Sequence, residues 1–313
     1  MINTRIVSYM LSVLLLSNLS VLADTDEPDV NKEEFAKSQS SDVHGFFDLS
    51  IKNDYITPRG LLVSNTGLTI QVLAGITLDV YKNPCGWLSQ ASITMGVWND
   101  IWTKQGDPYV GGWNELDWFV GVNTLIAKNW LFEVQYLQFV SPPHHFTPEN
   151  NIEFFLGYDD SSWGRPVVFN PYVKFFWAFS GDSTVIVGRH GHTYDVEIGL
   201  VPTLELKNLC VPVILTAPTW ITVGPPSFWN GGTLGLKNKK VNFGVFSTGL
   251  NAKFPLTLMP ARLGNWYFDI GGQYYYLIND NLLQAQTITL GVPTYKHGHR
   301  NIGVATTGIG FSF

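Results

Sequence analysis

Hydrophobic and polar residues alternate along most of the chain from Phe46 onward. Side chains of an extended strand point to opposite faces at successive residues, so strict alternation predicts strands with one apolar and one polar face. Most of the segments have roughly the 9–11 residues that a tilted membrane strand needs. We predict twelve strands, at residues 46–55, 68–81, 87–98, 116–126, 130–139, 152–158, 172–179, 194–206, 213–223, 243–254, 266–278 and 302–313.

In the clearest of these strands every carboxylate lies on the polar face. Within 194–206, for example, Val196 and Ile198 alternate with Asp195 and Glu197. A soluble sandwich would also alternate, but its polar face would carry more Lys and Glu and fewer glycines in mid-strand. Strands that cross lipid must close on themselves, because each unpaired backbone group there costs several kcal/mol. The pattern therefore predicts an all-β fold, a closed antiparallel transmembrane β-barrel of about 12 strands over residues 44–313.

The connections and the aromatic residues support the same architecture. Trp87, Trp130 and Trp266 lie at strand ends, where membrane barrels carry their interfacial aromatic residues. Long connections alternate with short ones, and this parity predicts both termini in the periplasm. The connections at 159–171 and 255–265 are longer than expected of periplasmic turns, and Pro212 and Pro218 predict a bend or bulge in strand 213–223.

Composition narrows the class further. Only 14% of the residues are charged and 14% are aromatic, with a mean hydropathy of +0.07. A net charge of -6 argues against a nucleic-acid partner. Residues 1–23 read as a secretory signal, with Arg5 before an apolar core and Val21-Leu22-Ala23 as the cleavage site. Residues 24–43 are polar and acidic, which predicts a disordered periplasmic lead-in.

Two stretches carry a resemblance. The C-terminal sequence NIGVATTGIGFSF alternates and stops on an aromatic residue, which resembles the closing strand of bacterial outer-membrane β-barrels. Residues 53–60, NDYITPRG, resemble the S-D-Y-x-x-R-G opening of an uncharacterised proteobacterial outer-membrane group, with Asn53 replacing Ser and a proline inserted before Arg59. The resemblance implies localisation in the cell outer membrane, contact with its lipid, and recognition of the C-terminal strand by the barrel assembly machinery.

The predicted lumen is the first candidate site. Its charged residues are mainly acidic, and a low-dielectric wall of one sign favours cations. The leading hypothesis is a channel for passive diffusion of small solutes, mildly cation-preferring. The alternative is a closed structural or surface-interaction barrel, whose inward polar residues bond to one another and whose loops are presented outside. The residues expected to set selectivity are Asp48, Lys52, Asp79, Asp117, Glu133, Glu153, Lys174, Asp195, Glu197 and Asp269, with Asp54, Glu205 and Lys253 on the same face.

Other features are open to two interpretations. His-x-His on an extended chain can hold Zn²⁺, Cu²⁺ or Ni²⁺, so His190, His192, His297 and His299 form a candidate surface metal site; the alternative is solvated loop histidines. Cys85 and Cys210 fall in predicted periplasmic turns and could form a disulfide or remain two separate thiols.

The sequence gives no sign of catalysis. There is no G-x-S-x-G and no closely spaced His and Ser on one strand face, so we predict neither an enzyme nor a cofactor. No loop has a sequence pattern that predicts folding into the lumen. A monomer is the expected oligomeric state.

Overall fold

A closed antiparallel barrel makes up most of the computed structural model, which describes residues 42–104, 112–144, 146–180, 192–229 and 241–313. Closure is complete because β1 pairs with β4 on one side and with β17 on the other. Within the described residues the wall has twelve strand positions, as predicted: β1 (Val43–Lys52), β4 (Thr69–Lys82), β5 (Leu88–Trp102), β6 (Trp113–Ile126), β7 (Trp130–Val140), β8 (Glu149–Tyr158), β10 (Pro171–Ser180), β11 (Thr193–Leu200) with β12 (Thr203–Leu206), β13 (Val213–Thr216) with β14 (Thr219–Val223), β15 (Phe243–Pro255), β16 (Asn265–Leu277) and β17 (Asn301–Ser312).

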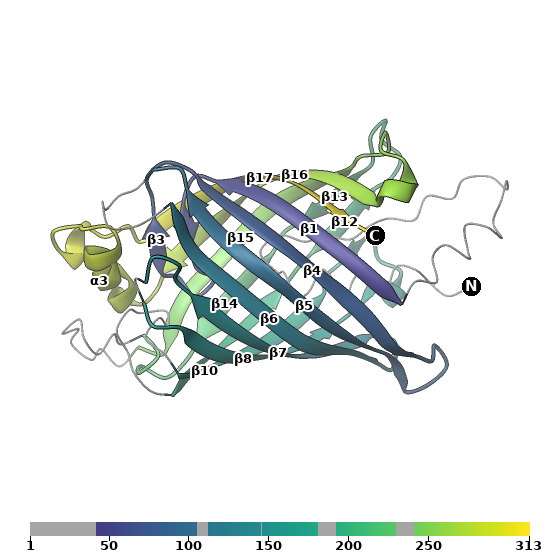
Figure 1. Ribbon diagram of the computed structural model, residues 1–313, viewed down its shortest axis with the longest axis horizontal. Helices are drawn as coiled ribbons and strands as arrows, with labels where there is room; N and C mark the ends of the chain where they lie inside the picture. Colours follow the sequence, from purple (N-terminus) through teal and green to yellow (C-terminus); the bar gives the residue numbers. More distant parts are fainter. Residues whose placement is uncertain (1–41, 105–111, 145, 181–191, 230–240) are drawn as a thin grey trace.

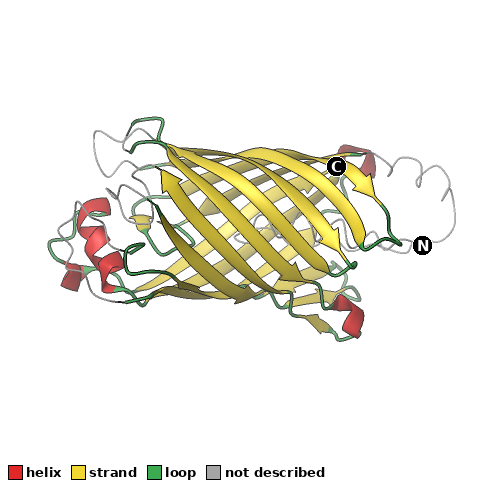
Figure 2. Cartoon of the chain, turned by 90° about the horizontal axis from the view of Figure 1, so that it is seen from below, coloured by secondary structure: helices red, strands yellow, loops and turns green. Residues whose placement is uncertain are grey.

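The other elements lie at the two ends of the barrel. Three short strands stand outside the twelve positions: β2 (Tyr55–Ile56) and β3 (Leu62–Ser64), which pair with each other, and β9 (Val167–Val168), which pairs with β12. The helical segments are η1 (Ser161–Trp163), η2 (Ala261–Leu263), α3 (Asp280–Thr289) and η3 (Tyr295–His297). Figure 2 shows the strands as one cylinder with the helical segments confined to its ends. No helix in the described ranges is long and apolar enough to cross a membrane.

The two ends of the barrel differ. The start of β1 and the C-terminus lie at one end, which we call the terminal end, and α3 lies at the other, the loop end (Figure 1). The strand ends that flank the connections predicted to be long and external lie at the loop end, and those that flank the shorter connections lie at the terminal end. The structure therefore confirms that long and short connections alternate between the two ends of the barrel.

The alternation also gives the correct face for the wall residues. Val80, Val122 and Ile198 are exposed on the outside, where lipid surrounds a membrane barrel, while Asn123 and Asp195 are buried inside. Glycines on the inner face make room for large rings from neighbouring strands. A Cβ at Gly75 would collide with the ring of Phe46, and one at Gly310 would collide with that of Tyr267, which explains mid-strand glycines on the polar face.

The C-terminal strand closes the barrel as its sequence suggested. β17 lies between β16 and β1, the two predicted neighbours. The last residue takes part in the seam, since the Phe313 amide donates to the Gly45 carbonyl at 3.0 Å and the Gly45 amide donates back at 3.1 Å. The Phe311 ring stacks on Trp266, with centroids 4.6 Å apart.

Two neighbouring wall positions are broken where proline removes a backbone donor. Pro218 separates β13 from β14, which fits the predicted bend, and Pro202 separates β11 from β12, which was not predicted. The prolines' carbonyls remain bonded, because Ala217 donates to Pro202 at 2.8 Å and Gly249 donates to Pro218 at 3.0 Å. The breaks therefore bend the wall without opening it.

The long connection at 159–170 is an ordered extension of the wall. The Asp160 side chain, only 2% exposed with its residue, accepts the amides of Phe169 and Asn170 at 2.9 and 2.8 Å. It thereby fixes the chain that carries β9 to its pairing with β12. The Asp160 carboxylate thus accepts backbone hydrogen bonds that the backbone itself would accept in a tight turn.

Replacing Asp160 should destabilise this end of the barrel. Asp160→Ala leaves two partly buried amides without this acceptor, at about 1 kcal/mol or more each. We expect the free energy of unfolding, followed by tryptophan fluorescence in urea, to fall by about 2 kcal/mol or more. Asp160→Asn keeps one acceptor oxygen and should lose less than half as much. Equal stability of the alanine variant and the parent would show that the connection is held by other contacts.

Candidate functional site

The lumen is lined by the charged residues that the sequence placed there. Asp48, Glu133, Asp195 and Glu197 are buried inside the barrel. Glu153 and Lys174 also face inward and keep a small exposed fraction. Asp117, Lys52 and Asp269 lie partly buried on the same face. The inner face of the barrel is thus a polar surface to which these residues contribute from seven strands.

Three of the expected lining residues lie at the rims instead. Asp79 is close to the terminal end, where Lys82 and His44 contact it at 2.8 and 3.0 Å. Glu205 pairs with Lys207 at 3.1 Å at the same end. Asp54 follows β1 at the loop end; partial burial raises the pKa of its carboxyl, and the charge of His299 acts in the opposite direction.

The first loop, residues 53–68 between β1 and β4, folds into the lumen. The expectation that no loop does so was wrong. Between β2 and β3 the chain turns at Thr57, whose carbonyl accepts the Gly60 amide at 2.9 Å. Gly60 has φ +96°, a conformation that side-chain-bearing residues adopt only with strain. The turn carries Arg59 at its tip. The N-D-Y-I-T-P-R-G stretch of the sequence is therefore the segment that enters the barrel.

Apolar residues anchor this loop at the loop end. Leu62 is fully buried, and its carbonyl accepts the hydroxyl of Thr289 in α3 at 2.6 Å. Trp220 on β14 donates its indole N–H to the Pro58 carbonyl at 3.3 Å. One continuous apolar cluster joins the first loop, α3, the segment after β14 and both walls; its members include Ile56, Leu61, Leu62, Leu125, Leu131, Phe155, Phe176, Phe228, Trp229, Val245, Leu277, Leu282, Leu283, Ile302 and Val304.

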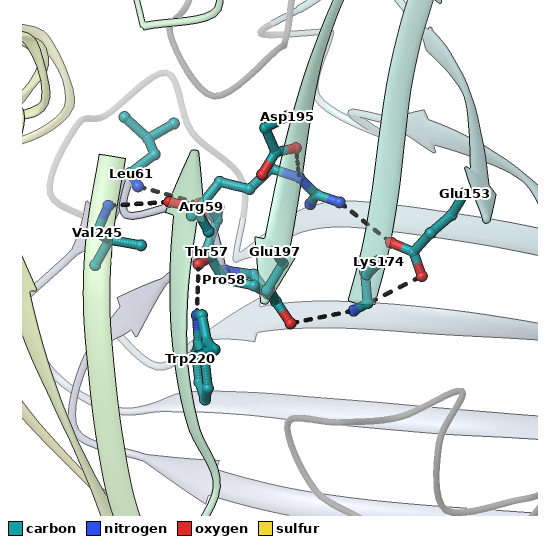
Figure 3. A network of polar contacts seen from close by, with 11 residues as sticks. Thr57, Pro58, Arg59, Leu61, Glu153, Lys174, Asp195, Glu197, Trp220 and Val245 are labelled. Carbon is teal, nitrogen blue, oxygen red and sulfur yellow. Dashed lines mark hydrogen bonds and ion pairs between the residues drawn. The ribbon is translucent and has the colours of Figure 1, made fainter. Parts of the chain in front are cut away.

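At the tip of the loop Arg59 reaches the opposite wall (Figure 3). Its guanidinium carbon lies 3.4 Å from the centroid of the Phe176 ring on β10. β10 is six strand positions from β1 in either direction around the barrel, so the loop spans the whole lumen. Arg59 Nη2 lies 3.4 Å from Glu153 on β8, and Nε lies 3.4 Å from Asp195 on β11.

A second cation completes this network. Lys174 Nζ lies 3.7 Å from both Glu153 and Glu197, and the Tyr172 hydroxyl donates to Glu197 at 2.7 Å. Two cations thus face three carboxylates in a setting that is largely shielded from water. Such a network stabilises the loop position only while both sides are present, since either half alone would leave buried charge.

Between the first loop and the wall β4–β8, the loop end carries four further acidic residues: Asp100, Glu115, Asp117 and Glu149. Asp100 accepts the Thr69 hydroxyl, the Trp102 indole N–H at 2.6 Å and the Asn114 amide at 3.2 Å. The Tyr55 hydroxyl donates to Glu115 at 2.9 Å. Burial raises the pKa of Tyr55, which keeps this hydroxyl a donor. This hydrogen bond therefore attaches the first loop to β6 as well.

A third charged group fills the terminal half of the lumen. Lys253 on β15 lies directly across from Asp269 on β16, and its Nζ is 3.4 Å from the Tyr267 ring centroid. The Tyr267 hydroxyl donates to Asp48 at 2.9 Å. Lys52 lies near the same carboxylates. This half of the lumen therefore has its own compensated charges.

Sequence reasoning missed several lumen residues for identifiable reasons. Asp100 and Glu115 were placed in a loop, although β5 and β6 continue past them. Glu149 was likewise placed in a loop, although β8 begins there. Tyr55 was predicted as the last residue of the first strand, whereas β1 ends at Lys52 and Tyr55 belongs to the connection that carries Arg59. No alternation indicates the inward path of this connection. The apolar Ile56, Leu61 and Leu62 within it were the available signal, because a loop in water seldom carries so many.

The histidines and cysteines have no common site in the described structure. His192 lies against the Trp177 ring, and His297 bonds Thr294 at 2.8 Å, while His190 falls outside the described residues. The described ranges contain no group of three or more His, Cys, Asp or Glu placed to hold a metal ion. Cys85 and Cys210 are exposed free thiols, so the disulfide is not formed. The four-histidine metal site stays a prediction.

Comparisons with known proteins assign no family to the chain. No family model matches the chain, and no curated protein matches it. The transport unit of the autotransporter AIDA-I from Escherichia coli is similar over 100% of both chains, at 14% identity and a TM-score of 0.43. An outer-membrane channel from Pseudomonas putida F1 matches at 8% identity over 87% of this chain and 95% of its own, with a TM-score of 0.46. LpxR from Salmonella typhimurium matches at 9% identity over 85% of this chain and 99% of its own, with a TM-score of 0.43.

The architecture itself decides the class. Twelve antiparallel strand positions close without an edge among the described residues, and the outer face is apolar. In a membrane only a closed barrel satisfies the backbone of crossing strands. By fold the chain is a closed transmembrane β-barrel. The similarities are too distant to say which task this barrel performs, so its function has to be argued from the lumen.

Proposed function

We propose that this barrel is a cation-preferring channel for small solutes, and that the first loop closes it in the conformation described here. The observation that carries the proposal is Arg59, which crosses the lumen and is held by carboxylates on the opposite wall. A loop that is fixed across a charged lumen by ion pairs has the two arrangements that a gate requires, one paired and one released.

Cation preference follows from the charges along the path. Within the described wall and first loop, and leaving out the residues at the rims, ten carboxyl groups face four cationic side chains, an excess of six acidic groups. Field lines inside a low-dielectric wall are focused along the lumen, which raises the local concentration of cations. The carboxylates are Asp48, Asp100, Glu115, Asp117, Glu133, Glu149, Glu153, Asp195, Glu197 and Asp269, and the cations are Lys52, Arg59, Lys174 and Lys253.

A permanently closed barrel that presents its loops is the competing function. It is favoured by the apolar cluster, which joins the first loop to α3 and to both walls. In a closed barrel the inward charges would serve only to bond one another. The excess of acidic groups over cationic side chains argues against this function, because a purely structural lumen gains nothing from burying carboxyl groups that no cation matches.

Reversal potentials in planar bilayers test the channel proposal. Under a KCl gradient we expect transient openings whose reversal potential lies on the cation side. Glu115→Gln combined with Asp117→Asn removes two loop-end carboxyl groups and should move the reversal potential toward zero. Asp79→Asn, at the terminal rim, is the matched control with a smaller effect. Anion preference would contradict the proposal, as would absence of current even after the first loop is shortened.

A further inference from the structure

The residues that hold Arg59 have the composition of a binding site for a guanidinium group. We propose that Phe176, Glu153, Asp195 and Glu197, here called the guanidinium site, bind solutes that carry a guanidinium or primary amine. In the closed conformation Arg59 occupies this site as an internal substitute for the solute. The inference rests on the channel function proposed above and names the class of solute for it.

The geometry of the site suits a planar cation. The Phe176 ring offers its face, on which the Arg59 guanidinium carbon sits at 3.4 Å. Carboxylates on the two strands flanking β10 meet the edge of the same group. Phe176 and Asp195 are each only 2% exposed, so both cation–π attraction and charge pairing act with little screening by water. An aromatic face combined with two carboxylates at the edge selects a flat, multi-donor cation.

Arg59 fills this site imperfectly. Its distances to Glu153 and Asp195 are both 3.4 Å, whereas charge-assisted N–H···O contacts are usually about 2.7–2.9 Å. Arg59 Nε and Asp195 Oδ1 are both buried and, among the described residues, make no hydrogen bond. The loop backbone, tied at Pro58 and Leu62, holds the guanidinium short of its acceptors. A free guanidinium carries no such tether and can form the shorter bonds.

The guanidinium site needs a cation, so binding of a solute cation and closure by Arg59 exclude each other. With Arg59 in place, two cations face Glu153, Asp195 and Glu197. When Arg59 leaves, Lys174 alone remains beside three buried carboxylates, which is unfavourable unless another cation enters. A solute cation that binds the site therefore stabilises the released loop. Binding of the solute thus favours the open lumen through which the solute passes.

Chemical rescue tests the site independently of current. Arg59→Ala should lower the thermal unfolding midpoint of the barrel in detergent, and millimolar ethylguanidinium should restore it. We expect ethylguanidinium to act at about tenfold lower concentration than tetramethylammonium, which has the charge but no N–H donor. Urea, planar and neutral, should have no effect. Arg300→Ala is the matched control, because Arg300 pairs with Asp280 outside the lumen and its loss should not be rescued.

The outcomes separate the site from the channel. Equal rescue by tetramethylammonium, or no rescue, would overturn the guanidinium site. Rescue that persists after Asp195→Asn is added would also overturn it. Currents in Arg59→Ala without rescue would leave the channel standing and remove the site, whereas rescue without currents would do the reverse. If the alanine variant does not assemble, Arg59→Lys keeps the charge, and ethylguanidinium should then compete with the ammonium and raise the current.

Discussion

Replacing residues 55–64 by a short glycine–serine linker is expected to convert rare openings into a nearly constant open state. The replacement removes Arg59 and withdraws Ile56, Leu61 and Leu62 from the cluster that fills the loop end. Each buried aliphatic side chain contributes about 1.5–3 kcal/mol. Three of them together reach the roughly 5.5 kcal/mol that moves a two-state equilibrium from 1:99 to 99:1. Single-channel recording in planar bilayers measures the open fraction directly.

The loop itself supplies the control for that variant. Asn65 and Thr66 are exposed and lie in the same connection but outside the inward turn. Replacing both with alanine should leave the open fraction unchanged. A shortened variant that folds, inserts and still passes no current would show that α3 and the segment of Phe228 and Trp229 suffice to seal the lumen. The barrel would then be permanently closed.

Lys253→Met is expected to lower the free energy of unfolding more than any other single lumen change considered. Lys253 is 1% exposed and stands across the sheet from Asp269, with its ammonium on the Tyr267 ring. Removing one partner of a buried pair leaves an uncompensated charge, which costs about 3–5 kcal/mol. Urea unfolding of the barrel in lipid vesicles, followed by tryptophan fluorescence, gives the difference.

Two further variants isolate the cause of that loss. Adding Asp269→Asn to Lys253→Met removes the orphaned charge and should recover most of the stability. Lys82→Met changes a lysine that is 41% exposed and paired with Asp79 at the terminal rim. The Asp79 side chain is buried but keeps its contacts with His44 and Gln90 after the change, so the loss of stability should be smaller than for Lys253→Met. If Lys253→Met were as stable as the parent, Lys52 alone would be enough to compensate Asp48 and Asp269.

The barrel could be predicted from the sequence because it follows from the alternation of apolar and polar residues within each strand. Alternation fixes which residues face lipid, and a single error of register would expose Asp195 to lipid and bury Ile198 inside. The strand ends were less certain, since Asn99 and Asp100 look like loop residues and yet continue β5. The same local reasoning passed over Pro202, whose effect depends on the neighbouring break at Pro218.

The first loop could not be predicted, because its conformation is set by contacts far away in the chain. Arg59 is recognisable in the sequence as part of a short motif, but its partners come from β8, β10 and β11, more than ninety residues later. Glu153 and Asp195 were correctly placed in the lumen. What they hold there depends on how far residues 53–64 reach, and only the three-dimensional path of that loop shows this.

The crossing of the lumen by Arg59 has one more consequence. In the channel proposed above, Glu153 and Asp195 would both hold the first loop in place and meet a passing cation. Closure and selectivity would then depend on the same two carboxyl groups. A substitution of either one would weaken both the preference for cations and the closure. Any adaptation to a different solute has to alter Arg59 together with its carboxylates.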